Sequence, residues 1–255
     1  MPLPADFYFF AIPAVILVGL SKGGFAGSMG MLGVPIMALS LSPVQAAAIM
    51  LPILVVMDMV GLWAYRGKAD WSILQIMIPA ACLGIGLGWL MADLLSAELI
   101  RLAVGLTALA FVFDYALGKL KKNGSEQEQP EKGSISAIFW GAVSGLTSFI
   151  AHVGGPPYQI HTLSLRLDKI TFVATSVYFF TIVNAIKLVP YFALGQFSTQ
   201  NLQTSLTLLP LAPIATLTGI WLVRHISQTY FYRLAYSAMF VIALKLIWDS
   251  VTAWL

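Results

Sequence analysis

The chain has 255 residues, of which 59% are hydrophobic and only 10% are charged, and its formal net charge is +3. About a quarter of the residues of a soluble protein are charged, so this composition excludes a protein whose whole surface faces water and predicts an integral membrane protein. The apolar runs are long and lack strict alternation, which favours membrane helices over a transmembrane β-barrel. The single cysteine, Cys82, excludes an intrachain disulfide.

Ten apolar segments follow one another along the chain, and we expect each to be helical. They span residues 6–20, 25–41, 43–65, 71–92 and 98–117 in the first half, and 135–151, 155–166, 169–193, 199–223 and 230–250 in the second. The first lies beside Asp6 without a preceding basic residue, so we interpret it as a membrane segment and not as a signal peptide. The long polar stretch at residues 118–134 predicts a cytoplasmic linker between two transmembrane repeats, residues 1–117 and 135–255.

Two of the apolar stretches are interrupted by glycine, proline and polar residues at matching places in the two halves. The first interruption extends from Gly19 to Gly30 and continues to Pro35, and the second extends from Gly145 to Pro157. Inside a membrane, backbone leaves a helix only where protein or a water-filled cavity satisfies its polar groups. A pair of such segments, one in each half, therefore predicts the substrate site of a transporter.

The two halves are similar over most of their length, which predicts an internal duplication. Aligned pairs include Gly19 with Gly145, Ser21 with Thr147, Asp58 with Asn184, Ser72 with Ser198, and Arg101 with Arg233. If successive connections alternate between the two sides of the membrane, most of the 14 lysines and arginines fall on one side, which the positive-inside rule assigns to the cytoplasm. Both termini then face outward. Because each half crosses an odd number of times, the second half is inverted relative to the first.

We therefore expect an all-α integral membrane protein of about ten helical segments, arranged as two inverted repeats of five. The first two segments of each repeat are short, and the sequence leaves open whether they form a re-entrant hairpin or two abbreviated crossings. Aromatic residues near the segment boundaries, including Trp63, Tyr65 and Trp71, are typical of the belts that contact the membrane interfaces.

The interrupted segments carry the residues that we expect to bind an anion. A helix that restarts after a break points N–H groups and the positive end of its dipole at the gap, and a lysine and several hydroxyl groups add further donors. The candidate substrate-binding residues are Ser21, Lys22, Gly23, Gly24, Gly27, Ser28, Met29 and Gly30 in the first half, and Thr147, Ser148, His152, Gly154, Gly155 and Pro156 in the second. The alternative is that the glycines only permit close packing of membrane helices.

Further polar residues lie within the apolar segments, namely Asp58, His161, Asn184 and Lys187. Asp58 either binds a coupling proton or ion or makes a static polar contact between helices. If the halves meet around a two-fold axis, Asp58 and Lys187 approach each other; alternatively, the Lys187 side chain extends outward to the interface. His152 and His161 either act in anion binding or proton transfer, or serve as structural donors.

The sequence contains no zinc-protease motif H-E-x-x-H, no phosphate-binding loop G-x-x-x-x-G-K-[ST] and no G-x-S-x-G motif. We therefore expect no catalytic residues, no metal centre, no cofactor and no nucleic-acid partner. The sequence argues against a membrane-embedded enzyme, and it favours a purely structural membrane subunit even less.

The two interrupted segments, at residues 19–35 and 144–157, resemble those of the sulfite exporter TauE/SafE family of membrane permeases. The resemblance covers essentially the whole chain, including the duplicated halves and the arginine that opens each last helix. It implies movement of sulfur-containing anions such as sulfite, sulfonates or sulfoacetate across a bacterial inner membrane, usually outward. The first segment departs from the family's run of consecutive glycines, because residues 26–30 read Ala-Gly-Ser-Met-Gly. The departure falls on candidate lining residues and therefore concerns the substrate rather than the class of transporter.

We expect a secondary transporter that exports such anions by alternating access, with a small anion and the lipid bilayer as its partners. An anion channel, and a permease for a non-sulfur anion such as a carboxylate, are the alternatives. Because an anion leaves a negative-inside cell along the membrane potential, export as a uniporter is compatible with the sequence. A homodimer is compatible with so small a permease, although the sequence shows no dimer face.

Overall fold

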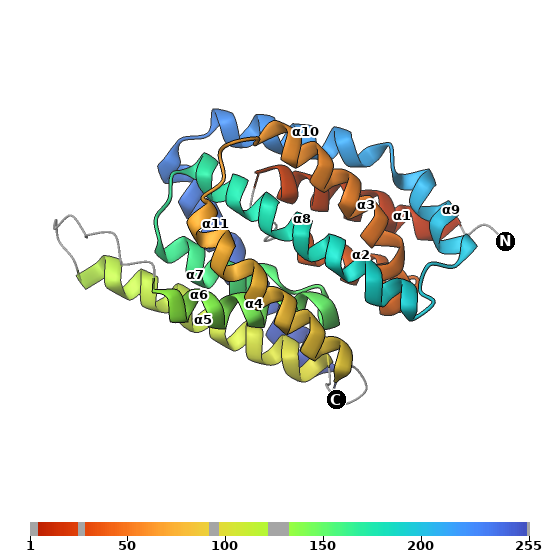
Figure 1. Ribbon diagram of the computed structural model, residues 1–255, viewed down its shortest axis with the longest axis horizontal. Coiled ribbons are helices and arrows are strands. Elements are labelled where there is room, and N and C mark those ends of the chain that lie inside the picture. Colours follow the sequence, from red (N-terminus) through yellow and green to blue (C-terminus); the bar gives the residue numbers. More distant parts are fainter. Residues whose placement is uncertain (1–4, 25–28, 92–96, 122–132, 254–255) are drawn as a thin grey trace. The chain divides into compact units, whose positions relative to one another are not determined.

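The computed structural model describes residues 5–24, 29–91, 97–121 and 133–253, which form helices joined by short connections (Figure 1). In chain order these are α1 (Ala5–Gly24), the 3-10 helix η1 (Met29–Leu32), α2 (Gly33–Met37), α3 (Pro43–Ala64), α4 (Trp71–Leu90), α5 (Ala97–Lys121), α6 (Ser134–Ala151), α7 (Gly155–Ser164), α8 (Lys169–Ala193), α9 (Thr199–Leu208), α10 (Leu211–His225) and α11 (Gln228–Thr252). Within these described ranges the protein contains no strand, so the prediction of an all-α protein is confirmed there.

Most helices coincide closely with the predicted segments, but three segments differ. In the described residues, the segment predicted at residues 25–41 contains only η1 and the five-residue α2, which ends at Met37. Helix α1 continues to Gly24 instead of ending near residue 20, so Lys22 belongs to its last turn. The segment predicted at residues 199–223 is divided into α9 and α10, which are bent by 46° relative to each other (Figure 1). Pro210 lies at this bend, where its missing N–H interrupts the ladder of helical hydrogen bonds.

Several helices are long and apolar enough to cross a membrane, as the protein's composition predicts. In the described part of the chain five such stretches occur, at Asp6–Gly24, Val44–Ala64, Trp71–Leu90, Lys169–Ala193 and Gln228–Thr252, and the bent pair α9 and α10 would make a sixth if it crosses as one. The chain is thus a multi-pass membrane protein. Helix α7 has only 10 residues and reaches about 15 Å, roughly half the hydrocarbon thickness, so α7 does not span the membrane by itself.

The chain forms two compact units, and each unit takes helices from both halves of the sequence. Unit 1 comprises Met1–Leu74 and Lys169–Ser227, and unit 2 comprises Gln75–Asp168 and Gln228–Leu255. The predicted repeats, residues 1–117 and 135–255, are therefore interleaved in the fold instead of forming one unit each. The inverted orientation of these repeats stays a prediction.

In unit 1, helix α1 packs closely on α10, and α3 packs on α8. A Cβ atom added at Gly19 would lie 2.5 Å from the Cβ of Ala215, and one added at Gly23 would lie 2.1 Å from the carbonyl oxygen of Thr216. Only glycine permits this approach, because a methyl group at either position would displace the α10 backbone. The glycines of the first interrupted segment thus hold α1 against α10.

In unit 2, helix α4 packs on α6 through glycines in the same way, and α5 packs on α11. A Cβ atom added at Gly145 would lie 2.1 Å from the carbonyl oxygen of Ala81, and one added at Gly84 would lie 2.0 Å from that of Ala142. Gly145 is the residue that aligns with Gly19, and both contact an alanine of the partner helix. The internal duplication stays a prediction.

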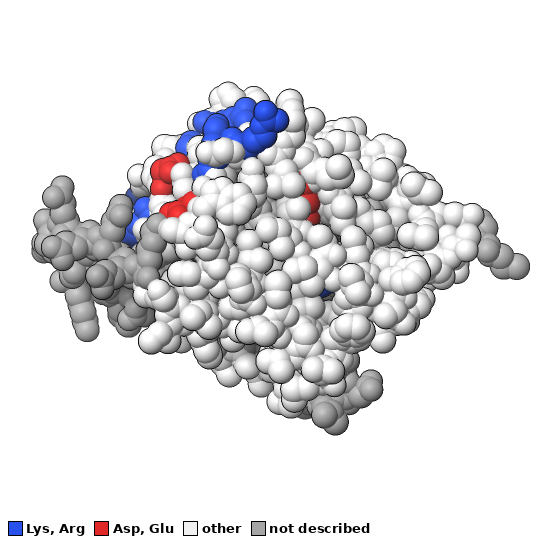
Figure 2. All heavy atoms as spheres, in the orientation of Figure 1, with Lys and Arg blue, Asp and Glu red and all other residues white. Residues whose placement is uncertain are grey.

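Positively charged residues gather at one end of unit 1. The Nζ of Lys169 at the start of α8 donates to the carbonyl of Ile226 and, over 3.4 Å, to that of Arg224. The Arg224 guanidinium donates over 3.1 Å to the carbonyl of Ala64 at the end of α3. These three helix ends therefore share one end of the unit. On the face drawn in Figure 2, most of the visible lysine and arginine atoms lie in one region, and most of the described surface carries neither basic nor acidic residues.

Candidate functional site

An ion pair between Lys22 and Asp58 lies inside unit 1. Lys22 occupies the last turn of α1, and Asp58 lies within α3. The Nζ of Lys22 donates to Oδ1 of Asp58, and the two side chains are only 11% and 2% exposed. Since removing a charge from water is costly, such a pair within a membrane segment marks a candidate functional site.

The second oxygen of the Asp58 carboxylate is held by α8. The side-chain amide of Asn184 donates to Oδ2 over 2.7 Å, in a buried contact. Both carboxylate oxygens therefore have partners, one on α1 and one on α8. This arrangement fixes the position of the carboxylate and links three helices through a single side chain.

Lys187 adds a second buried ammonium group to this region. It follows Asn184 by three residues on α8, so the two side chains project from the same face of the helix. Lys187 is 1% exposed and interacts electrostatically with both Lys22 and Asp58. The side chain is buried in the fold and does not extend outward. We call Lys22, Asp58, Asn184 and Lys187 the buried charge cluster.

Hydrogen bonds hold the end of α1 beside this cluster. The hydroxyl of Tyr65 donates over 2.6 Å to the carbonyl of Gly23, which no longer has a partner within α1 because the helix ends at Gly24. Ser21 is fully buried, and its Oγ accepts a hydrogen bond of 3.0 Å from the N–H of Gly30. Both sides of the interruption are thereby tied to unit 1.

The second interruption, between α6 and α7, lies in unit 2 and is satisfied by hydroxyl groups. The Oγ of Ser144 donates over 2.7 Å to the carbonyl of Gly154, and Oγ1 of Thr147 lies 3.2 Å from the carbonyl of Val153. The same Thr147 hydroxyl lies 2.8 Å from the carbonyl of Val143. A hydroxyl has one proton to donate, so Thr147 uses it on backbone carbonyls in this conformation.

His152 forms the turn between these two helices. Its φ of 55° places it in the left-handed region at the end of α6, where a non-glycine residue is uncommon. Its Nε2 atom is buried. Gly154 follows in a narrow space, because an added Cβ would lie 2.7 Å from the Cβ of Ser148. The turn therefore has a fixed backbone path with an imidazole at its corner.

The restarting helices supply fewer N–H donors than we expected from the sequence. Helix α7 begins with Gly155 followed by Pro156 and Pro157, and proline has no N–H group. Helix α2 contains only five residues, and the N–H of Gly30 that precedes it is bonded to Ser21. The starts of α2 and α7 therefore offer few N–H groups, whereas the buried charge cluster supplies charged side chains.

The remaining predicted site residues lie in diverse surroundings. Gly24 packs against Gly219 of α10, with its added Cβ 2.6 Å from that carbonyl oxygen. His161 of α7 is buried, and its Nδ1 lies 3.1 Å from Oγ of Ser136. Met29 opens η1. Gly27, Ser28 and most of the predicted linker, residues 122–132, lie outside the described residues.

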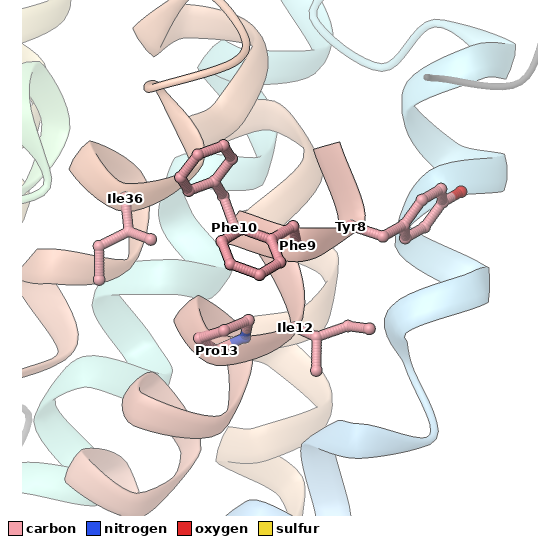
Figure 3. A pocket seen from close by; sticks show the side chains of 6 residues that line it. All are labelled: Tyr8, Phe9, Phe10, Ile12, Pro13 and Ile36. Carbon is pink, nitrogen blue, oxygen red and sulfur yellow. The ribbon is translucent and has the colours of Figure 1, made fainter. Parts of the chain in front are cut away.

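A separate apolar groove of about 410 Å³ lies on unit 1 beside the first turns of α1 (Figure 3). Its lining residues are Tyr8, Phe9, Phe10, Ile12, Pro13 and Ile36. Phe9 is 76% exposed, and the lining includes none of the candidate anion-binding residues.

Sequence reasoning missed two residues that organise the site. Tyr65 was expected at a membrane interface, yet it is fully buried and binds Gly23, whereas the neighbouring Trp63 is exposed as expected. Ser144 was not a candidate, although its hydroxyl satisfies the carbonyl of Gly154. An aromatic hydroxyl at the end of a segment gives no sequence signal that separates an interfacial position from a capping position.

Comparison with protein families gives a match to the family described as sulfite exporter TauE/SafE, which covers residues 11–246. Comparison with curated proteins and with solved structures finds no match. The matched range contains both interrupted segments and all four residues of the buried charge cluster.

Proposed function

Because this chain belongs to the sulfite exporter TauE/SafE family, whose members are membrane transporters of sulfite-type anions, we propose that it is a secondary transporter of small sulfur-containing anions such as sulfite or sulfonates. The proposed mechanism is alternating access, with export from the cytoplasm across a bacterial inner membrane.

The buried charge cluster is the observation that carries this proposal. Two ammonium groups, Lys22 and Lys187, lie with one carboxylate, Asp58, among apolar helices. A buried positive group attracts an anion and replaces part of the anion's hydration shell. Lys22 is the most accessible of the three and provides the first contact for the substrate in this proposal.

The charged end of unit 1 supports the proposed orientation. The connection after α3 carries Arg66 and Lys68, the last turn of α10 carries Arg224, and α8 begins with Lys169. Hydrogen bonds join these three helix ends. The positive-inside rule assigns this end to the cytoplasm. Expulsion of a monovalent anion then follows the membrane potential, which supplies about 2.3 kcal/mol per charge for each 100 mV.

Transport by purified protein in proteoliposomes tests the proposal. We expect saturable efflux of sulfite or methanesulfonate, together with stabilisation of the detergent-solubilised protein against heat by the same anions. Stabilisation by carboxylates alone would contradict the sulfur assignment, and a flux that fails to saturate with substrate would favour a channel.

Two variants test the residues assigned to the site. Lys22→Ala removes the accessible ammonium group, and His152→Asn removes the imidazole while retaining a residue that tolerates the left-handed turn. We expect a strong loss of anion flux in Lys22→Ala and a reduced flux in His152→Asn, both with folded protein. Wild-type flux in both variants would exclude these residues from the site.

A further inference from the structure

We propose that the buried charge cluster selects its substrate by charge, accepting anions with one negative charge and using Asp58 to reject anions with two. The inference rests on the proposed function, since it assumes that the cluster binds the transported anion. It assigns Asp58 a role in specificity, in addition to its contacts with Lys22 and Asn184.

The charges that unit 1 buries add up to one positive charge. Asp58 and Lys187 lie inside α3 and α8 and Lys22 lies in the last turn of α1, and all three side chains are buried or nearly so. The other lysine, arginine, aspartate and glutamate residues that the structure describes in unit 1 are near helix ends or in connections, namely Asp6, Arg66, Lys68, Asp70, Lys169 and Arg224. Two ammonium groups and one carboxylate leave a net charge of +1 when all three groups are ionised.

This net charge favours a monovalent anion. One negative charge on the substrate brings the occupied cluster to neutrality, whereas two leave it with a net negative charge. An uncompensated charge is costly where water is excluded and the dielectric constant is low. The cluster therefore distinguishes anions that have the same oxygen atoms but different charge.

The geometry around Asp58 holds its carboxyl group in the site. Asn184 donates to Oδ2 over 2.7 Å, and Lys22 donates to Oδ1. If a substrate draws Lys22 away from Oδ1, the amide of Asn184 on α8 still binds Oδ2 of the Asp58 carboxylate. Asp58 then remains close to the bound anion and repels a second negative charge.

Methanesulfonate and sulfate make a suitable pair of probes, because both present sulfur-bound oxygens while the first carries one negative charge and the second two. Binding of each to the purified full-length protein is measured by calorimetry or by ligand-dependent thermal stabilisation. We expect the wild type to bind methanesulfonate at least about tenfold more tightly than sulfate. In Asp58→Asn, which raises the net charge of the cluster to +2, we expect the ratio to move toward sulfate by at least about tenfold.

Changes at Lys187 provide the complementary test. Lys187→Gln brings the cluster to a net charge of zero, so methanesulfonate binding should weaken by at least about tenfold. The double variant Asp58→Asn with Lys187→Gln returns the net charge to +1 and should regain the preference for methanesulfonate. Asp249→Asn is the matched control, because Asp249 pairs with Lys245 on the exposed face of α11, and its selectivity should equal that of the wild type.

The outcomes separate this inference from the proposed function. If the wild type binds neither probe and transports no sulfur-containing anion, the proposed function is wrong. If the wild type binds methanesulfonate but Asp58→Asn retains the wild-type ratio, selection by charge is wrong and the transport function stands. If Asp58→Asn does not fold, the double variant tests the inference. A preference of the double variant for sulfate would contradict selection by net charge. If neither folds, wild-type binding of sulfate as tight as that of methanesulfonate overturns the inference.

Discussion

The side-chain amide of Asn184 donates to the carboxylate of Asp58 over 2.7 Å, although the two residues are 126 positions apart in the chain. They are also the residues that align with each other when the two halves of the sequence are compared. Equivalent positions of a repeat meet in this way where a two-fold axis passes between the helices that carry them. The contact joins α3 to α8, so it lies within unit 1.

The Lys22–Asp58 pair should contribute to stability as well as to transport. Lys22→Gln removes the ammonium group that donates to Oδ1 of Asp58, while Asn184 and Lys187 remain, and we expect a loss of about 1.5–3 kcal/mol in the free energy of unfolding. Lys245→Gln is the control, because that lysine forms an exposed i, i+4 pair with Asp249 worth about 0.3–0.5 kcal/mol. Thermal unfolding in detergent measures both. Equal melting temperatures for the two variants would show that the buried pair does not stabilise the fold.

Gly23 should not tolerate a side chain, because its Cα lies against the α10 backbone. The methyl group of Gly23→Ala would lie 2.1 Å from the carbonyl oxygen of Thr216, so α1 and α10 must separate. We expect a loss of at least about 2 kcal/mol, within the range found for overpacked cores. Gly86→Ala is the matched control on α4, where no atom lies within 4 Å of the added Cβ. That change should be neutral or slightly stabilising, since alanine is the better helix former. The yield and melting temperature of the two variants check this prediction, and a stable Gly23→Ala protein would contradict it.

The hydroxyl of Tyr65 should hold the end of α1 in place. In Tyr65→Phe the carbonyl of Gly23 loses its donor in a buried position, which we expect to cost about 1–3 kcal/mol. Tyr230→Phe serves as control, because Tyr230 is 66% exposed. We also expect faster hydrogen exchange in the last turn of α1 in Tyr65→Phe, measured by mass spectrometry. Unchanged exchange there would mean that packing against α10 alone fixes this end.

The hydroxyl of Thr147 should matter for the turn at His152. Thr147→Val keeps the shape of the side chain but removes the donor near the carbonyl of Val153, and we expect a loss of about 1–3 kcal/mol. Thr147→Ser retains the hydroxyl and should keep most of the stability. Melting temperatures of the three proteins test the order wild type, Ser, Val. If the Ser variant were the less stable of the two, the methyl group and not the hydroxyl would be the important part of Thr147.

Much of the secondary structure was predictable from the sequence because long apolar runs are typical of membrane helices. The bend at Pro210 was not predicted, since a proline within an apolar segment is also compatible with a continuous helix. Pro52 and Pro79 lie inside α3 and α4 without dividing them. Whether a proline breaks a helix depends on whether neighbouring groups satisfy the freed carbonyl, and that depends on packing.

The candidate site was predictable in part. Charged residues in apolar runs are conspicuous, so Lys22, Asp58 and Lys187 were identified before their positions were known. Their association follows from the packing of α1 and α8 with α3, which apolar patterns do not encode. For the same reason, the sequence did not show that Gly23 and Gly24 face α10. The sequence alone does not distinguish a glycine that permits close helix packing from a glycine that exposes backbone to a ligand.

The interleaving of the two halves has a consequence for how the protein is made. Unit 1 requires α1 and α3 together with α8 and α10, and unit 2 requires α4 to α7 together with α11. Helices are synthesised and inserted in chain order. Helices α1 and α3 are therefore present before their packing partners α8 and α10 have been synthesised. During this interval Lys22 and Asp58 are present before Asn184 and Lys187 have been made. Completion of both units depends on the second half of the chain, and their assembly is therefore a late event in biogenesis.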